Sequence, residues 1–335
     1  MRFAIWCPPN ERALRLAKQM GVTDIVSALP AEQAGPVWEL MPLIHLRKKV
    51  EEAGLRLSVI ESIPITDAIK LGLPDRDRDI DNFCQSLRNM GAAGIPILCY
   101  NWMAVLFVLR TSFTTRVRGE ALSNSYEHEL SERGPVPELA GLATREALWK
   151  NLEYFLKAVV PVAEKAGVQL AMHPDDPPIS SCRGVERTFT CPEDFQRLID
   201  LVPSPNNGIT YCQGCFSEMN ADVPATIRHF AGQKKLFFAH FRNVRGPVTH
   251  FVEVFHDEKG NADMYEAMKA YYESGFEGPM RPDHLPFMEG EDTAPYGGFS
   301  MWGRLFAIGY MKGLLEGIQK TARASQFCEH GEERR

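Results

Sequence analysis

The chain has 335 residues and a formal net charge of -6, with 37 Lys and Arg against 43 Asp and Glu. A hydrophobic fraction of 44% is typical of a globular protein and excludes disorder as the main state. The acidic balance predicts no nucleic-acid partner, and no apolar run is long enough to predict a membrane span. We see no secretory leader, so we expect a cytoplasmic protein whose 8 cysteines are reduced thiols.

Short apolar runs alternate along the chain with longer segments of helical periodicity. The runs predicted as strands are 3–7, 24–28, 55–61, 95–101, 168–173, 208–212, 236–243 and 278–284. The segments predicted as helices lie within 10–20, 36–53, 75–94, 143–166, 191–202, 218–231, 261–274 and 301–317. Eight alternating units predict an α/β fold in which a parallel sheet closes into a (β/α)8 TIM barrel. The alternative is an open doubly wound sheet, but no GxGxxG follows the first run.

We predict one catalytic barrel domain over residues 1–320 and a charged tail over 321–335. Residues 107–142, after the fourth predicted strand, are polar and irregular, which indicates a loop insertion. This insertion is either a plain surface loop, a lid over the barrel mouth or an oligomer contact, and a homo-oligomer is left open. Residues 285–300 are rich in Gly and Pro and are also predicted as a loop.

Four consecutive predicted strands end in side chains that bind metals. His173, Cys212, His240 and Asp283 are each about one βα unit apart. A single buried Cys is usually only a packed hydrophobe, but four such ends in succession are hard to explain by chance. The carboxyl ends of the strands surround the barrel mouth, so we expect these groups to meet there. Two imidazoles, a thiolate and a carboxylate suit Mn²⁺, Fe²⁺ or Zn²⁺.

Further polar side chains lie near these strand ends. Arginine pairs well with carboxylates, so Arg281 and Arg242 suggest that the partner is a small polar anion such as a sugar acid. We expect Arg281 to act in catalysis. The residues predicted to bind substrate are Trp6, Asn101, Asp175, Arg242 and Asn243. Cys215 forms a CxxC with Cys212, but a zinc site would need a second pair, so Cys215 is interpreted as packing.

Several stretches of this sequence resemble mannonate dehydratase, a family with a xylose-isomerase-like barrel. They include HPDDPP (173–178), GITYCQGCFSEM (208–219), FAHFRNV (238–244) and RPDH (281–284), in the order of the family. The resemblance implies dehydration of D-mannonate to 2-keto-3-deoxy-D-gluconate in hexuronate breakdown, with Mn²⁺ or Fe²⁺. It implies the same four metal ligands, and it implies a role for His284 in proton transfer.

The sequence departs from the family pattern in regions expected to face the substrate. Cys7 and Pro8 stand where the family has Tyr and Gly after the first tryptophan, and Phe107 and Val108 stand in a stretch where it has an Asp-Trp pair. In PYGGF (295–299) the family's tyrosine maps to Tyr296 or to Phe299. We take Tyr296 as the candidate for the second proton-transfer role. The alternatives are a metal-dependent sugar isomerase or epimerase on the same barrel, and a non-catalytic sugar-acid binder.

Overall fold

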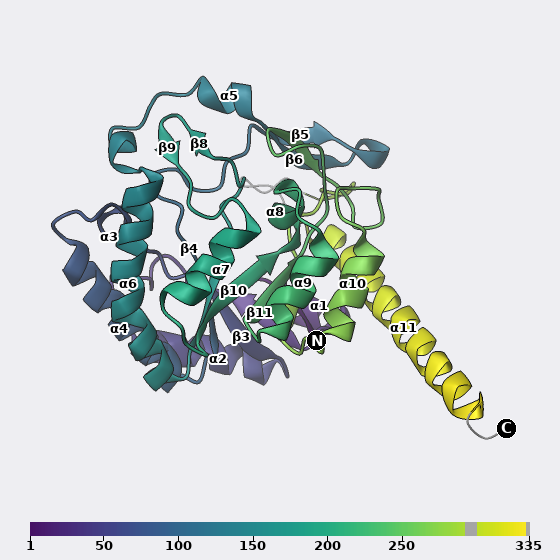
Figure 1. Cartoon of the computed structure of the whole chain (residues 1–335). Helices are drawn as coiled ribbons and strands as arrows, with labels where there is room; N and C mark the ends of the chain where they lie inside the picture. Colours follow the sequence, from purple (N-terminus) through teal and green to yellow (C-terminus); the bar gives the residue numbers. More distant parts are fainter. Residues whose placement is uncertain (292–299, 333–335) are drawn as a thin grey trace.

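The computed structural model describes residues 1–291 and 300–332, with side chains up to residue 324. Eight parallel strands close into a barrel in the order β1-β14-β11-β10-β7-β4-β3-β2, so the predicted TIM barrel is confirmed (Figure 1). Each predicted run overlaps one barrel strand. The strands are β1 Arg2–Trp6, β2 Asp24–Ser27, β3 Arg56–Glu61, β4 Ile97–Asn101, β7 Gln169–His173, β10 Asn207–Cys212, β11 Leu236–Phe241 and β14 Pro279–Pro282.

Helices form the outer layer. They are α1 Glu11–Gln19, α2 Leu40–Glu52, α3 Asp67–Leu71, α4 Arg76–Ala92, α6 Arg145–Ala166, α7 Pro192–Leu201, α8 Gln213–Glu218, α9 Val223–Gly232, α10 Met264–Glu273 and α11 Met301–Glu332. The longest of these, α11, runs unbroken past residue 320, where we expected the charged tail to begin, and projects beyond the barrel (Figure 1). In the described part of the chain, no helix has the length and apolar character needed to cross a membrane.

Helix α6 shows how local sequence sets the ends of an element. Its first turn is capped by the hydroxyl of Thr144, which accepts a hydrogen bond from the backbone N–H of Ala147. It ends at Gly167, whose φ of 69° lies in the left-handed region that glycine adopts without strain. The polypeptide then enters β7, so these caps place the strand that ends in His173.

The core has two layers because side chains alternate along each strand. One set packs outward against the helices. The other set fills the barrel with Ala4, Val26, Val59, Ile97, Cys99, Ala171, Phe237 and Phe238. Two residues after Ala171 stands His173, and two residues after Phe238 stands His240. The period of two therefore aims His173 and His240 at the barrel axis, above the packed layer.

The insertion at 107–142 is more ordered than the sequence predicts. Instead of an irregular loop, it contains β5 Ser112–Arg116, β6 Leu122–Glu127, α5 His128–Glu132 and two short 3-10 helices at Arg118–Glu120 and Ala140–Leu142. β6 pairs with β13 His250–Glu253, which pairs with β12 Val244–Arg245, giving an antiparallel sheet of order β12-β13-β6-β5. A hairpin of β8 Ser181–Cys182 and β9 Val185–Glu186 lies beside α5 (Figure 1). The sequence of the insertion looked irregular because β6 pairs with β13, which lies far away along the chain. We call the insertion, β12–β13 and this hairpin the cap.

The outer core layer can be tested at Phe155, which is fully buried on α6 against Phe83, Tyr100 and Trp102. We expect Phe155→Ala to lower the free energy of unfolding by about 3–5 kcal/mol, because the substitution leaves a cavity in packed aromatic surroundings. Phe107→Ala is the matched control, since Phe107 is 61% exposed. Urea unfolding followed by circular dichroism measures both variants. Equal losses for the two variants would contradict this description of the core.

Candidate active site

The four predicted metal ligands meet at the carboxyl end of the barrel. His173 Nε2 lies 3.2 Å from His240 Nδ1, which lies 3.6 Å from Asp283 Oδ2. Cys212 Sγ is 3.8 Å from the same carboxylate oxygen. Cys212, His240 and Asp283 are buried, and their ligand atoms lie within 4.8 Å of one another. Strand register explains the meeting, because Cys212 and His240 are direct neighbours across β10 and β11.

This donor set fits a divalent transition metal. Burial opposes ionisation of Cys212, but hydrogen bonds to Cys215, His173 and His240 hold the pKa of its thiol well below the usual value. Burial likewise opposes ionisation of Asp283, yet nearby cations hold its pKa well below the usual range. A thiolate and a carboxylate beside two imidazoles match the ligands that such ions prefer, and their two negative charges would offset the charge of the ion.

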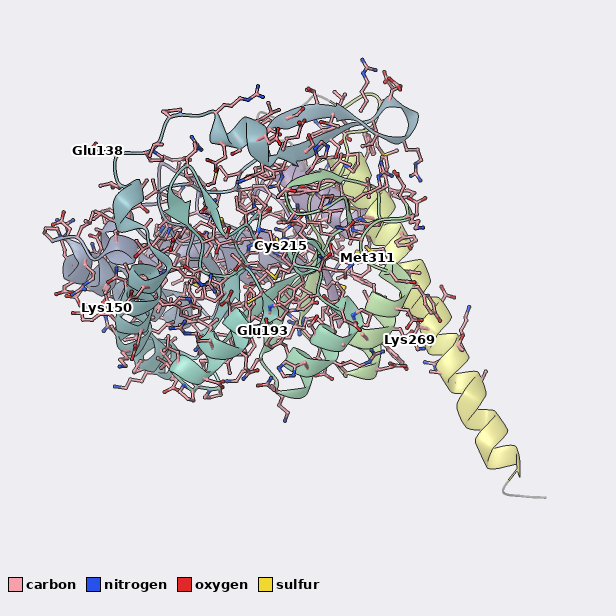
Figure 2. The ribbon with its side chains drawn as sticks, turned by 45° about the horizontal axis from the view of Figure 1, so that its top comes forward. Glu138, Lys150, Glu193, Cys215, Lys269 and Met311 are labelled. Atoms are coloured by element: carbon pink, nitrogen blue, oxygen red, sulfur yellow. The ribbon has the colours of Figure 1, made fainter. Side chains whose placement is uncertain are left out.

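Cys215, the second cysteine of the CxxC, lies next to Cys212. It follows Cys212 on α8 and lies toward the middle of the molecule (Figure 2). Burial raises the pKa of the Cys215 thiol well above the usual value, and its hydrogen bond to Cys212 raises it further. A protonated Cys215 next to an ionised Cys212 acts as a hydrogen-bond donor to it.

Arg281, predicted to be catalytic, lies directly beside the cluster. Its Nη1 donates to Asp283 Oδ1 at 2.6 Å, and its Nε and Nη2 donate to the carboxylate of Glu61 at 3.1 and 2.9 Å. Glu61 Oε1 also lies 3.3 Å from His240 Nε2. Burial would raise the pKa of Glu61, but the charges of Arg281 and His240 lower it to about 2. Our set of site residues omitted Glu61, although its place at the end of β3 was visible in the sequence.

His284 is held by two residues of the cap. Its Nδ1 is 2.7 Å from Glu253 Oε1 and 3.3 Å from Arg110 Nη2. Its Nε2 lies on the side of the metal ligands, 3.9 Å from Asp283 Oδ1. Burial alone would lower the pKa of His284, but the charges of Asp283 and Glu253 raise it. The imidazole is thus oriented by a carboxylate at one nitrogen and faces the ligand cluster with the other.

Arg242, predicted to bind substrate, is fully buried among carboxylates. Its Nη1 lies 3.2 Å from Asp176, and its Nη2 lies 2.8 Å from Glu253 and 3.3 Å from Glu218. Nη1 is also 3.8 Å from Cys212 Sγ. This guanidinium therefore supports the thiolate ligand and the cap carboxylate from within the protein.

The other predicted substrate residues divide into two groups. Asn101 and Trp6 lie at barrel strand ends: Asn101 neighbours His173 across β4 and β7, and Trp6 packs on the side chains inside the barrel. Asp175 and Asn243 are directed elsewhere. Asp175 accepts hydrogen bonds from the backbone of Thr188 and Phe189 and pairs with Arg187. The Asn243 amide donates to the carbonyls of Phe255 and Glu258.

Sequence reasoning missed Arg110, Asp176 and Glu253 as site residues. Arg110 donates to both oxygens of Asp176 at 2.9 and 2.8 Å, and to Glu253 at 2.7 Å. The signal available for Glu253 was its place at the end of the short segment HFVE, where a charged residue closes a run that contains two apolar residues. Tyr296 and Phe299 lie outside the described residues. Of the other departures from the family pattern, Cys7 is buried and Phe107 is exposed.

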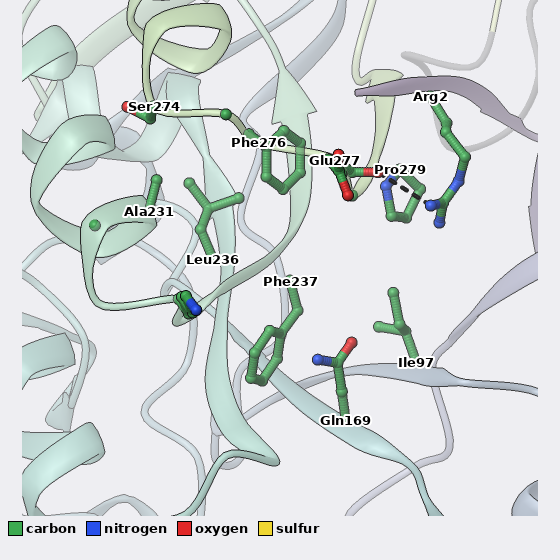
Figure 3. A pocket seen from close by; sticks show the side chains of 14 residues that line it. Arg2, Ile97, Gln169, Ala231, Leu236, Phe237, Ser274, Phe276, Glu277 and Pro279 are labelled. Carbon is green, nitrogen blue, oxygen red and sulfur yellow. Dashed lines mark hydrogen bonds between the residues drawn. The ribbon is translucent and has the colours of Figure 1, made fainter.

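A cavity of about 560 Å³ opens at the opposite, amino end of the barrel (Figure 3). Its lining includes Gln169, Phe237, Phe276 and Arg2, which donates a hydrogen bond to the carbonyl of Glu277. None of the predicted site residues lines it. In barrel enzymes the chemistry is at the carboxyl ends, so this cavity is not the active site.

Comparison with known proteins decides the family. The model of the family D-mannonate dehydratase (UxuA) matches residues 1–141 and 138–325. Mannonate dehydratase 2 of Halalkalibacterium halodurans is 36% identical over 340 residues, covering 93% of this chain and 98% of that protein. The chain belongs to the D-mannonate dehydratase family. It is therefore a hydro-lyase of the sugar-acid dehydratase class, and the predicted class of enzyme is confirmed.

Solved structures agree with this family. A crystal structure of mannonate dehydratase from Streptococcus suis serotype 2 matches with a TM-score of 0.89 and 35% identity, over 96% of this chain and 94% of that one. An L-ribulose 3-epimerase matches with a TM-score of 0.62 but only 16% identity, over 97% of each chain. That second likeness shows a shared barrel fold and nothing about activity. Mannonate dehydratases are metal-dependent enzymes, in keeping with the ligand cluster.

The two cysteines of the CxxC predict different outcomes for metal binding. Cys212→Ser should weaken Mn²⁺ binding by more than about 100-fold. The substitution replaces an ionised thiol that would bind the metal directly with a hydroxyl that stays neutral. Cys215→Ser should bind Mn²⁺ with close to wild-type affinity, because Ser can still donate a hydrogen bond to Cys212. The paramagnetic resonance signal of free Mn²⁺ gives both dissociation constants. Loss of binding in Cys215→Ser alone would reverse the assignment.

Proposed function

We propose that this protein dehydrates D-mannonate to 2-keto-3-deoxy-D-gluconate, using Mn²⁺ or Fe²⁺. The observation that carries the proposal is the cluster of His173, Cys212, His240 and Asp283 directly beside the oriented imidazole of His284. A cation site and a proton-transfer group in one barrel mouth are what elimination next to a carboxylate requires. The names of the relatives, at about a third identity over nearly the whole chain, support the same substrate.

The chemical difficulty lies in removing the proton on C2 of an aldonate. The carbanion that forms beside a carboxylate carries a second negative charge and is very unstable in water. When bound to the four ligands, Mn²⁺ or Fe²⁺ would supply the charge that stabilises the carboxylate side of this species. Arg281 adds a second cation from the protein itself, already oriented by its pairs with Glu61 and Asp283.

His284 is assigned to one of the two proton transfers. Glu253 holds its Nδ1, and Arg110 donates to the same Glu253 oxygen, so Nε2 is the nitrogen that faces the ligand cluster and exchanges a proton with substrate. Tyr296 is assigned to the other transfer. The C2–H bond breaks, its electron pair forms the C2–C3 double bond, and the C3 hydroxyl leaves with a proton as water. The enol then takes up a proton at C3 and loses the proton of its C2 hydroxyl, which gives the keto acid.

The remaining assignments concern substrate contacts. Trp6 and Asn101 lie at the barrel ends next to the cluster and are proposed to contact the sugar chain. We assign Arg242, Asp175 and Asn243 to positioning, because their side chains bind protein groups that hold the cap and the ligand thiolate. This revises the substrate role that the sequence predicted for these three residues.

The function is tested by turnover of a panel of aldonic acids with Mn²⁺ or Fe²⁺ added. We expect a 2-keto-3-deoxy acid, detected by its keto group and by a mass lower by one water, with D-mannonate as the best substrate. An isomerase or epimerase on the same barrel would give a product of unchanged mass. Binding of aldonates without turnover would indicate a non-catalytic sugar-acid binder. Either result would overturn the proposal.

Proton transfer is tested at His284. His284→Ala should lower kcat by about 10²–10⁴-fold while leaving bound metal unchanged, because His284 contributes a proton and not a ligand. Glu253→Gln should lower kcat by a smaller factor, since it removes only the charge that orients the ring. His229→Ala, on the exposed face of α9, is the matched control and should retain the wild-type rate. An active His284→Ala enzyme would remove His284 from the mechanism.

A further inference from the structure

A second group of metal-binding side chains lies in the cap. His128 and Glu132 stand one helical turn apart on α5, and Cys182 ends β8 in the neighbouring hairpin. A ligand atom of each lies within 4.8 Å of the others, and His128 Nε2 is 3.8 Å from Glu132 Oε1. None of the three belongs to the barrel mouth. The proposed dehydration assigns no role to this group.

Neighbouring groups already orient these ligand atoms. Tyr126 Oη lies 2.9 Å from His128 Nδ1, which turns Nε2 toward Glu132. The backbone N–H of Arg183 donates to Glu132 at 2.8 Å, and Ser131 Oγ lies 3.3 Å from Cys182 Sγ. Tyr126 binds the imidazole at the nitrogen that faces away from Glu132, and partners of this kind are typical of metal sites, where they set ring orientation and ligand basicity.

Cys182 is buried among apolar side chains, whereas His128 and Glu132 are partly exposed to solvent. The Cys182 side chain is fully buried against Tyr126, Ile179, Val244 and Phe251. The side chains of His128 and Glu132 are 30% and 41% exposed. An ion can therefore enter from solvent and bind a thiol that is shielded from bulk water on its other side.

We propose that His128 Nε2, a Glu132 carboxylate oxygen and Cys182 Sγ bind a Zn²⁺-like divalent ion, with water as the fourth ligand. Zinc takes His, Glu and Cys ligands at about 2.0–2.3 Å, which in a tetrahedron separates ligand atoms by roughly 3.3–3.8 Å. The separation of His128 and Glu132 is at the upper edge of this range. The softness of the thiolate favours Zn²⁺ over Mg²⁺ or Ca²⁺.

A second buried group of possible metal ligands shows why we place the ion at His128, Glu132 and Cys182. Asp176, Cys215 and Glu218 also bring ligand atoms within 4.8 Å, but the guanidinium of Arg242 lies among them, 3.2 Å from Asp176 and 3.3 Å from Glu218. That cluster already holds a cation. At His128, Glu132 and Cys182, no arginine or lysine side chain among the described residues forms an ion pair with the one carboxylate.

A bound ion would clamp two parts of the cap together. The insertion contributes α5, and the loop after β7 contributes the hairpin. A few residues beyond the hairpin, the N–H groups of Thr188 and Phe189 hold Asp175, and Arg187 donates to the carbonyls of Leu106 and Phe107. Zinc would therefore stabilise the folded cap, by mass action on the state that binds it.

The test must separate this ion from the one in the barrel mouth. Cys212→Ser removes the thiolate proposed for that site, and comparing this variant with and without Cys182 assigns the remaining thiolate ligand of added Co²⁺ to Cys182. We expect about one Co²⁺ per chain with sulfur-to-metal charge-transfer absorption in the near ultraviolet. The band should disappear in Cys212→Ser/Cys182→Ser and persist in Cys212→Ser/Cys191→Ser, the matched control. A band that survives loss of Cys182, or is missing from Cys212→Ser, overturns the proposal.

Partly exposed ligands provide a second test that does not alter the buried thiol. In the Cys212→Ser protein, His128→Gln and Glu132→Gln should each weaken Zn²⁺ binding at least tenfold by competition with a chromophoric chelator. Zn²⁺ should raise the melting temperature of Cys212→Ser but not of Cys212→Ser/His128→Gln. Unchanged Zn²⁺ affinity in both variants, with the melting temperature still responsive, shows that the ion binds elsewhere and overturns the site. Failure of the dehydratase assay leaves these readouts unaffected.

Discussion

Closure of the parallel sheet is the constraint on which the rest of this protein depends. In a closed barrel the side chains of every strand alternate between the interior and the helices, and every strand ends at the same mouth. His173, Cys212, His240 and Asp283 come from the ends of β7, β10 and β11 and the residue after β14, which are consecutive neighbours in the ring. An open sheet with the same elements would leave its first and last strands apart, and β1 and Trp6 would not adjoin β14.

Closure alone would concentrate negative charge at the mouth, and buried arginines offset it. Arg281 pairs with Glu61 and Asp283 on the barrel side, while Arg110 and Arg242 share Glu253 on the cap side. Pairs of this kind add little net stability because desolvation consumes most of their attraction. Their value here is geometric. A guanidinium with two or three carboxylate partners has one low-energy position, and so do the ligand and proton-transfer groups that share those partners.

The sequence predicted the barrel, and it predicted which strand ends carry titratable side chains, because both obey short-range rules. Strand runs, helical periodicity and a titratable residue at each strand end are visible without knowing any contact. The cap does not obey such rules: β6 pairs with β13, more than a hundred residues later, and neither shows a strong strand pattern alone. The same distance hid Glu253 and Arg110, whose roles exist only through that pairing. The directions of the Asp175 and Asn243 side chains could not be predicted for another reason, since proximity in sequence to His173 or His240 does not give direction.

The cap therefore contacts the residue to which we assign proton transfer. Arg110 comes from the insertion and Glu253 from the excursion after β11, and together they hold the nitrogen of His284 that faces away from the metal ligands. If the cap sheet separated, His284 would keep its place on the chain but lose both partners. Cap order thus sets the surroundings of this imidazole and of the proton transfer that we propose for it. A barrel of this type changes chemistry through such loops, while its strand ends continue to present the same ligands.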